Sequence, residues 1–195
     1  METGKDKDMK VDIYNTDKKY NIIYADPPWE YKQKQINFQH YDKGKKYINS
    51  VEEHYNTMSK KELYDMKSII ENITNKESCL LFMWATCPNL DLAIDLGREW
   101  GFEFKTVAFV WDKKRTNYGF YTLSQCELCL VFKKGKIPKK ETNNIKQFLS
   151  EYVDKHSKKP EEIRNRIDKM FSKQSRIELF ARQQVKGWDC WGNEV

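Results

Sequence analysis

The sequence is poor in the residues that build disulfide frameworks and metal sites. It has five cysteines and three histidines in 195 residues. Because the number of cysteines is odd, they cannot all be paired, and we expect free thiols. Cys126 and Cys129 form one Cys-x-x-Cys pair, but no second pair of cysteines or histidines stands at metal-ligand spacing. We therefore expect neither disulfides nor a bound metal ion.

Long apolar runs are also missing. No segment reaches the roughly 20 apolar residues that a membrane-spanning helix needs. Residues 1–10 mix acidic, basic and polar side chains and lack the apolar core of a secretory signal. We therefore expect a cytoplasmic protein that makes no membrane contact.

The composition fits one compact domain. Hydrophobic residues make up 39% of the chain, which is enough to close a single core. We find no internal repeat, and we place an N-terminal extension at residues 1–19 before a single domain at residues 20–195. The formal charge of +6 suits a polyanionic partner, although lysines that serve only solubility would give the same value.

Strand and helix patterns alternate along the chain. Apolar, β-branched and aromatic runs predict strands at residues 20–25, 79–85, 104–111, 126–133 and 176–180. Start and stop signals predict helices that begin at Ser59 and at Pro160, and a third over residues 90–100. Connections of crossover length between strands favour an α/β fold, Rossmann-like, with a doubly wound and mainly parallel sheet.

The strongest chemical signal is the segment Asp26-Pro-Pro-Trp29. Two consecutive prolines force the chain out of the sheet where Asp26 ends the first strand. In open α/β sheets, ligands bind at that edge. A turn with an anchoring tryptophan is the structural alternative, but an acidic residue before Pro-Pro and an aromatic residue after it favour a functional site.

These residue types suit methylation of an amino group on an aromatic ring. The lone pair of such a nitrogen is delocalised into the ring, so the nitrogen attacks only when its N–H groups are held by acceptors. The Asp26 carboxylate and the Pro27 carbonyl can accept those two hydrogen bonds, with Pro28 stiffening the turn. Trp29 offers a flat face for a base taken out of its stack. Asp26, Pro27, Pro28 and Trp29 are therefore the candidate catalytic residues.

The chain resembles the MT-A70-type adenine amino-methyltransferases, which are related to the β-class DNA amino-methyltransferases. Seven short segments stand in that family's order, and the resemblance covers about residues 20–195. They are Ile23–Trp29, Tyr55–Ser59, Leu81–Trp84, Glu127–Leu130, His156–Pro160, Arg176–Arg182 and Trp191–Glu194. The resemblance implies a class I S-adenosylmethionine-dependent methyltransferase fold with a permuted order of motifs.

The resemblance also implies a cofactor site for S-adenosylmethionine built from both ends of the chain. Asp26 would meet the methionine ammonium and Lys159 the methionine carboxylate. The ribose and adenine would be held by Glu178, Leu179, Phe180, Arg182, Gln183, Asn193 and Glu194. Tyr55 would lie near the acceptor base. The glycine-rich turn of most nucleotide-binding methyltransferases is missing after the last strand, where Ala181 to Gln184 stand instead.

Together these features predict an enzyme that transfers a methyl group from S-adenosylmethionine to adenine N6 in nucleic acid, with DNA favoured. RNA adenine and cytosine N4 stay open as acceptors, because the Asp-Pro-Pro turn suits any amino group on a ring. A silent subunit of a methyltransferase heterodimer and a nucleic-acid-binding domain without cofactor are the alternatives of another class. Specificity would come from the loops at 30–57 and 112–124 or from a second subunit, and a homodimer is a further hypothesis.

Overall fold

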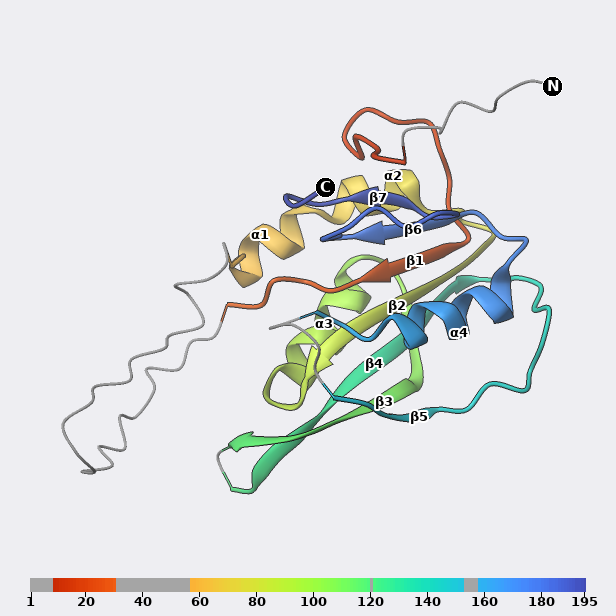
Figure 1. Cartoon of the computed structure of the whole chain (residues 1–195). Coiled ribbons are helices and arrows are strands. Elements are labelled where there is room, and N and C mark those ends of the chain that lie inside the picture. Colours follow the sequence, from red (N-terminus) through yellow and green to blue (C-terminus); the bar gives the residue numbers. More distant parts are fainter. Residues whose placement is uncertain (1–8, 31–56, 120, 153–157) are drawn as a thin grey trace.

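A seven-stranded sheet forms the centre of the computed structural model, which describes residues 9–30, 57–119, 121–152 and 158–195 (Figure 1). The strand order is β5-β3-β4-β2-β1-β6-β7. The strands are β1 (Ile22–Ala25), β2 (Ser78–Thr86), β3 (Glu103–Tyr118), β4 (Leu123–Gly135), β5 (Phe148–Ser150), β6 (Arg176–Leu179) and β7 (Asp189–Trp191). Among these strands, β4 alone runs against its neighbours β2 and β3, and the remaining pairs are parallel. The predicted mainly parallel α/β sheet is confirmed.

Helices cover both faces of the sheet, as the alternation of buried side chains requires. Ile23 and Ala25 of β1 pack toward α1 (Lys60–Asp65), α2 (Lys67–Ile73) and α3 (Leu90–Glu99). Ile22 and Tyr24 point to the opposite face, which α4 (Glu161–Phe171) covers. Because β1 is buried on both faces, its sequence is a continuous apolar run, as is typical of a central parallel strand.

The helix signals of the sequence mostly hold, with one exception. Ser59 caps α1 through the predicted capping box with Glu62. The single helix expected there is instead two short helices that meet at Met66. Pro160 stands at the N-cap of α4, as expected from a proline at a helix start. None of the helices in the described ranges is long and apolar enough to cross a bilayer.

The largest departure from the sequence prediction is the segment from Lys113 to Ser124, which we expected to be turn-rich. In the structure β3 continues to Tyr118 and β4 begins at Leu123, so the two strands form a long hairpin. Cross-strand pairing stabilises this hairpin, whereas the sequence there is polar and carries turn-forming residues. The three-residue strands β5 and β7 were also not predicted, because so short a segment shows no period.

Part of the N-terminal extension packs on the domain. Ile13 is fully buried among the core residues on the face of α1 to α3. The backbone N–H of Val11 donates to the carbonyl of Cys190 at 2.9 Å, which joins the two ends of the described chain. The domain boundary at residue 20 stays a prediction.

Candidate active site

The Asp26-Pro27-Pro28-Trp29 segment leaves the sheet directly after Ala25, the last residue of β1. The backbone N–H of Trp29 donates to the Pro27 carbonyl at 2.9 Å and closes a three-residue turn. The N–H of Met58 donates to the Pro28 carbonyl at 2.8 Å and ties the turn to the segment before α1. Two rigid proline rings and these two hydrogen bonds hold the turn in one conformation, and a carbonyl has a second lone pair, so Pro27 can still accept from a ligand.

Asp26 belongs to a chain of four alternating charges at this edge of the sheet. Lys159 Nζ lies 3.0 Å from Asp26 Oδ1 and 3.3 Å from Glu127 Oε2. Lys113 Nζ lies 3.2 Å from Glu127 Oε1. All four side chains are largely buried, with Asp26 the most open at 20% exposure. A buried cation, Lys159, is therefore shared between the two carboxylates of Asp26 and Glu127.

The strand pairing explains why these side chains meet. Glu127 stands two residues before Cys129, and Lys113 two residues after Trp111, and both Cys129 and Trp111 are buried on the face of α4. Side chains two apart on a strand share a face, so Glu127 points to that same side. Lys113 stands where β3 leaves its regular register, and its ion pair with Glu127 shows that it reaches the same side. Lys159 precedes α4 and reaches over the strand ends, with its Nζ 5.7 Å from the ring centre of Trp84.

Burial and charge act differently on these groups. Burial raises the pKa of Asp26 above its ordinary value, more than the neighbouring Lys159 lowers it. Burial alone would also raise the pKa of Glu127, but Lys159 and Lys113 together bring it below the ordinary value. Burial alone would lower the pKa of Lys159, but Asp26 and Glu127 raise it. Lys159 and Glu127 are thus held in their charged forms, whereas burial destabilises the ionised form of Asp26.

Trp29 is an interior residue in the structure. Its side chain belongs to the core on the face of α1 to α3, and the residue is 5% exposed. Its indole N–H donates to the Trp84 carbonyl at 3.2 Å. The contact anchors the turn to β2. Stacking of a base on Trp29 stays a prediction, and the described residues leave its ring little open surface.

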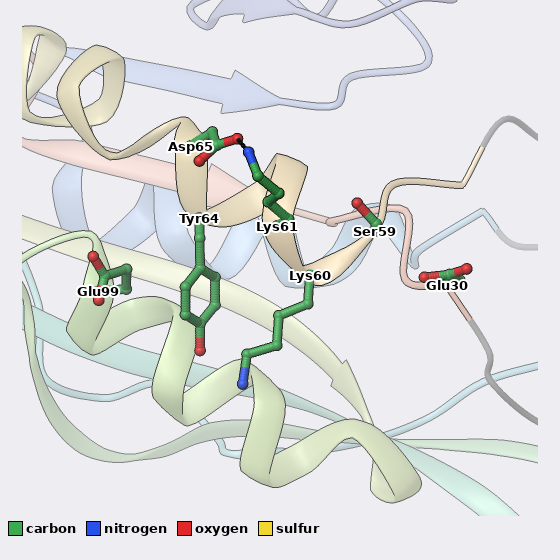
Figure 2. Close-up of a pocket in the computed structure, with 7 residues that line it drawn as sticks. All are labelled: Glu30, Ser59, Lys60, Lys61, Tyr64, Asp65 and Glu99. Carbon is green, nitrogen blue, oxygen red and sulfur yellow. Dashed lines mark hydrogen bonds and ion pairs between the residues drawn. The ribbon is translucent and has the colours of Figure 1, made fainter.

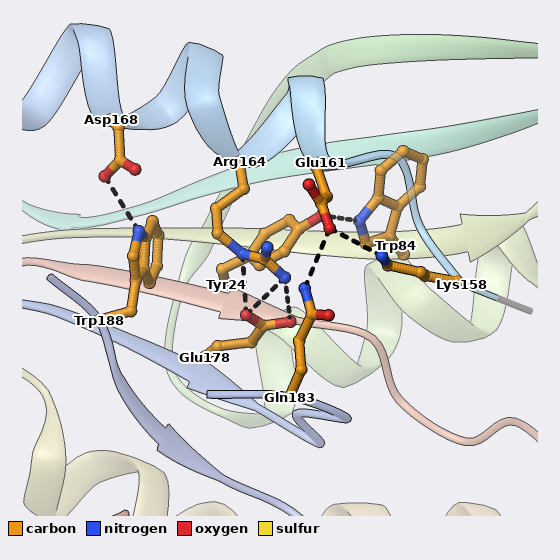
Figure 3. A network of polar contacts seen from close by, with 9 residues as sticks. All are labelled: Tyr24, Trp84, Lys158, Glu161, Arg164, Asp168, Glu178, Gln183 and Trp188. Atoms are coloured by element: carbon orange, nitrogen blue, oxygen red, sulfur yellow. Dashed lines mark hydrogen bonds and ion pairs between the residues drawn. The ribbon is translucent and has the colours of Figure 1, made fainter. Parts of the chain in front are cut away.

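Glu178 has a structural partner that the sequence did not show. Its carboxylate receives two hydrogen bonds from Arg164 of α4, each at 3.0 Å, and both residues are buried (Figure 3). Burial raises the pKa of the Glu178 carboxyl, and the contact with Arg164 opposes that rise. The contact of Glu178 with ribose stays a prediction. Through these hydrogen bonds the Glu178 carboxylate fixes α4 to β6.

We predict that the Arg164–Glu178 pair can be exchanged for apolar residues but not broken. Arg164→Met alone leaves a buried carboxylate unpaired and should lower the free energy of unfolding by about 3–5 kcal/mol. The double variant Arg164→Met, Glu178→Leu should restore most of that loss, because no buried charge remains. Urea unfolding of the two variants and the wild type measures this difference. Equal losses in the single and double variants would contradict a purely structural role for the pair.

The turn after β6 has unusual backbone geometry. Leu179 is fully buried, so it can contribute only backbone atoms to a ligand. Phe180 has φ of +60°, a left-handed conformation that glycine adopts most readily. The N–H of Ala181 donates to the Trp191 carbonyl at 2.9 Å, and Phe180 packs edge-on against Trp191. A residue other than glycine thus adopts a strained backbone conformation in this turn, and such strain is common at functional sites.

The remaining predicted cofactor residues gather at the same turn. Arg182 Nε lies 3.7 Å from Glu194 Oε1, which joins the turn to the C-terminal tail. Gln183 donates to Glu161 at the start of α4 at 3.4 Å (Figure 3). Asn193 is exposed in the tail beside Glu194. Arg182 also lowers the pKa of Asp26, so the turn lies within electrostatic reach of the first strand's end.

A separate hollow of about 650 Å³ lies beside α1 (Figure 2). It is lined by Glu30, Ser59, Lys60, Lys61, Tyr64, Asp65 and Glu99. Asp26 and Lys159 do not line it. Glu30 follows Trp29 directly, so the hollow adjoins the Asp-Pro-Pro-Trp turn.

The structure thus places Asp26 beside Lys159 and within electrostatic reach of the turn after β6, and the binding of a cofactor by these residues stays a prediction. It adds Glu127 and Lys113, to which the sequence analysis gave no role. A charged residue inside an apolar strand was the available signal for Glu127, and Glu178 carries the same signal. Tyr55 lies outside the described residues, and its placement near an acceptor base stays a prediction.

Comparisons with known proteins agree with this geometry. The MT-A70 family pattern matches residues 20–194. The chain is 47% identical to the "Type II methyltransferase M.MunI" of Mycoplasma sp over 190 residues, which are 91% of this chain and 78% of that protein. It is 24% identical to an "N(6)-adenosine-methyltransferase MT-A70-like" protein of Arabidopsis thaliana over 97% of this chain, but spans only 25% of the plant protein. The chain therefore belongs to the MT-A70 family of methyltransferases.

Proposed function

We propose that this methyltransferase transfers a methyl group from S-adenosylmethionine to the N6 amino group of adenine in DNA. The observation that carries the proposal is the Asp26 carboxylate, which a rigid turn fixes at the carboxyl end of β1 beside the buried Lys159. The similarity to a type II methyltransferase favours DNA as the acceptor, and it is stronger than the similarity to the plant relatives, whose names specify adenosine.

The residues at the site fit S-adenosylmethionine. Its methionine part carries an ammonium and a carboxylate, and Asp26 and Lys159 supply one charge of each sign 3.0 Å apart. We propose that Asp26 holds the ammonium and Lys159 the carboxylate. The polar groups around Phe180, Arg182, Gln183, Asn193 and Glu194 would hold the ribose and adenine. When bound, S-adenosylmethionine supplies an electrophilic methyl group on its sulfonium.

Asp26 and Pro27 would act on the acceptor base. The Asp26 carboxylate and the second lone pair of the Pro27 carbonyl can accept the two N–H groups of the adenine amine. These hydrogen bonds orient the nitrogen and stabilise the positive charge that develops on it. The protein needs no separate base, because the methylated ammonium loses its proton readily to water.

The choice of DNA is tested by offering three acceptors of the same sequence. We expect labelled methyl groups to enter duplex DNA at least about tenfold faster than RNA, with single-stranded DNA as the third acceptor. A tenfold ratio corresponds to about 1.4 kcal/mol in transition-state binding, which differential contacts to the two polymers readily supply. Preferred transfer to RNA would overturn the proposed acceptor and leave the chemistry intact.

We further propose that the protein works in the cytoplasm, where S-adenosylmethionine and nucleic acid are both at hand. The mechanism above needs one copy of the chain. The homodimer hypothesis is tested separately by light scattering during gel filtration, and only monomer at working concentration would reject it.

A further inference from the structure

The β3–β4 hairpin projects beyond the active-site edge of the sheet (Figure 1). We call residues 112–126 the arm. The strand β2 pairs with β4 only as far as Glu127, so the part of β4 from Leu123 to Cys126 extends past the end of β2. At about 3.3 Å per residue, Leu123 lies roughly 13 Å beyond Glu127. The arm thus starts at the candidate active site and leads outward from it.

A large bulge directs the basic residues of the arm. Asp112 pairs with Cys126 and Asn117 with Ser124, so four residues of β3 stand opposite Gln125 alone. Lys114 within this bulge has φ of +52°, a left-handed conformation. Bulges are common beside active sites, where they re-aim side chains. Here Lys113 points inward to Glu127, whereas Lys114 and Arg115 are exposed.

The bulge is fixed by hydrogen bonds to one carboxylate. Asp112 Oδ1 accepts from the backbone N–H of Lys114 at 2.9 Å and from the Gln125 amide at 2.6 Å. Asp112 Oδ2 accepts from the Ser150 hydroxyl of β5 at 2.8 Å. These contacts tie both strands of the arm and β5 together. The exposed positions of Lys114 and Arg115 are therefore built into the fold.

The outer part of the arm combines this positive charge with exposed aromatic rings. Tyr118 is 89% and Tyr121 99% exposed. The sequence from Lys113 to Cys126 contains no acidic residue. Basic and aromatic side chains together contact the phosphates and bases of nucleic acid. A two-stranded β-ribbon also fits the major groove of duplex DNA, which is about 12 Å wide.

We propose that the arm is a DNA-binding ribbon that docks the duplex beside Asp26, with Arg115 and Tyr118 among its contacts. This inference rests on the proposed DNA acceptor. A second copy of the chain is a poorer occupant, because a two-fold interface would place the same positive patch of both copies face to face. The phosphate backbone supplies the opposite charge. The arm is thus the element that brings the polymer to the catalytic edge.

The test compares a double variant in the β3 part of the arm with a double variant just after the end of β4. Arg115→Ala, Tyr118→Ala removes the proposed contacts, and Lys136→Ala, Ile137→Ala removes a basic and an apolar side chain that are also exposed. We expect the arm variant to bind duplex DNA at least about tenfold more weakly. The slope of log affinity against log salt concentration should fall by about one unit, as expected when one phosphate contact is lost. The control variant should bind DNA like the wild type. Calorimetry should show unchanged binding of S-adenosylmethionine to both.

The outcomes separate this inference from the proposed function. If the wild type methylates DNA and the arm variant binds DNA as tightly as the control, the arm inference is wrong and the proposed function stands. A change of oligomeric state in the arm variant, with DNA affinity unchanged, would show that the arm is a protein interface. If the wild type neither binds nor methylates DNA, the proposed acceptor fails and the arm inference fails with it.

Discussion

Asp26→Asn should lower kcat for methyl transfer by about 100- to 1000-fold, the effect of removing one preorganised electrostatic contact in other enzymes. The amide keeps the shape of the side chain and one acceptor oxygen, but it loses the charge that stabilises a positive nitrogen. The rate is measured with labelled S-adenosylmethionine at saturating DNA. Asp65→Asn, at an exposed surface ion pair, is the matched control and should keep full activity.

The same variant should fold at least as stably as the wild type. Because burial raises the pKa of Asp26, the folded protein binds that proton more tightly than the unfolded chain does. The ionised carboxylate therefore costs stability at neutral pH, and asparagine removes that cost. Lys159 keeps its contact with Glu127. An inactive variant that is also strongly destabilised would contradict a mainly catalytic role for Asp26, as would retention of more than a tenth of the activity.

Lys159→Met should lower the free energy of unfolding by about 3–5 kcal/mol, the usual loss when one partner of a buried ion pair is removed. Lys159 is 14% exposed and contacts two buried carboxylates, so its loss leaves Asp26 without its nearest cation and Glu127 with Lys113 alone. We expect weaker binding of S-adenosylmethionine as well, because its carboxylate loses the proposed partner. Urea unfolding and calorimetry measure the two effects.

The loss of stability in Lys159→Met should also depend on pH. Without Lys159 the pKa of Asp26 should rise further, and the pKa of Glu127 should rise above its value in the unfolded chain, so the folded variant takes up protons as the pH falls. Its stability deficit relative to the wild type should therefore shrink as the pH is lowered from neutral. Lys158→Met is the matched control, because Lys158 pairs with Glu161 near the surface and should change stability by less than about 1 kcal/mol. A Lys159→Met deficit that stays constant with pH would contradict the shared-cation arrangement.

The parts of the site that follow from local rules could be predicted from the sequence. The run Ile22 to Ala25 predicts a buried strand, and Pro27 and Pro28 force the chain out of the sheet after it. These rules place Asp26 at the ligand-binding edge without knowledge of any other strand. The capping box at Ser59 is equally local.

The parts that depend on partners distant in the sequence could not be predicted. Glu178 has no explanation within its own strand, because Arg164 approaches it from α4 on the face of the sheet. Glu127 is part of a matched motif, yet its contacts with Lys113 and Lys159 depend on how β3, β4 and the segment before α4 assemble. In both strands a charged residue within an apolar run signals a buried ion pair, but not the identity of its partner.

The arm shows why local turn signals failed at the hairpin. Asn117 and Gly119 are typical of turns, and the polar residues from Lys113 to Ser124 have no apolar alternation. Pairing with the opposite strand keeps this segment extended, and the bulge at Lys114 breaks the period that would otherwise indicate a strand.

The most direct test of the account is the chemical identity of the product. Purified protein is incubated with labelled S-adenosylmethionine and duplex DNA, the DNA is digested to nucleosides, and the labelled nucleoside is identified by mass spectrometry. We expect N6-methyladenine with the wild type and almost none with Asp26→Asn. Label in N4-methylcytosine, or equal N6-methyladenine from both proteins, would contradict it.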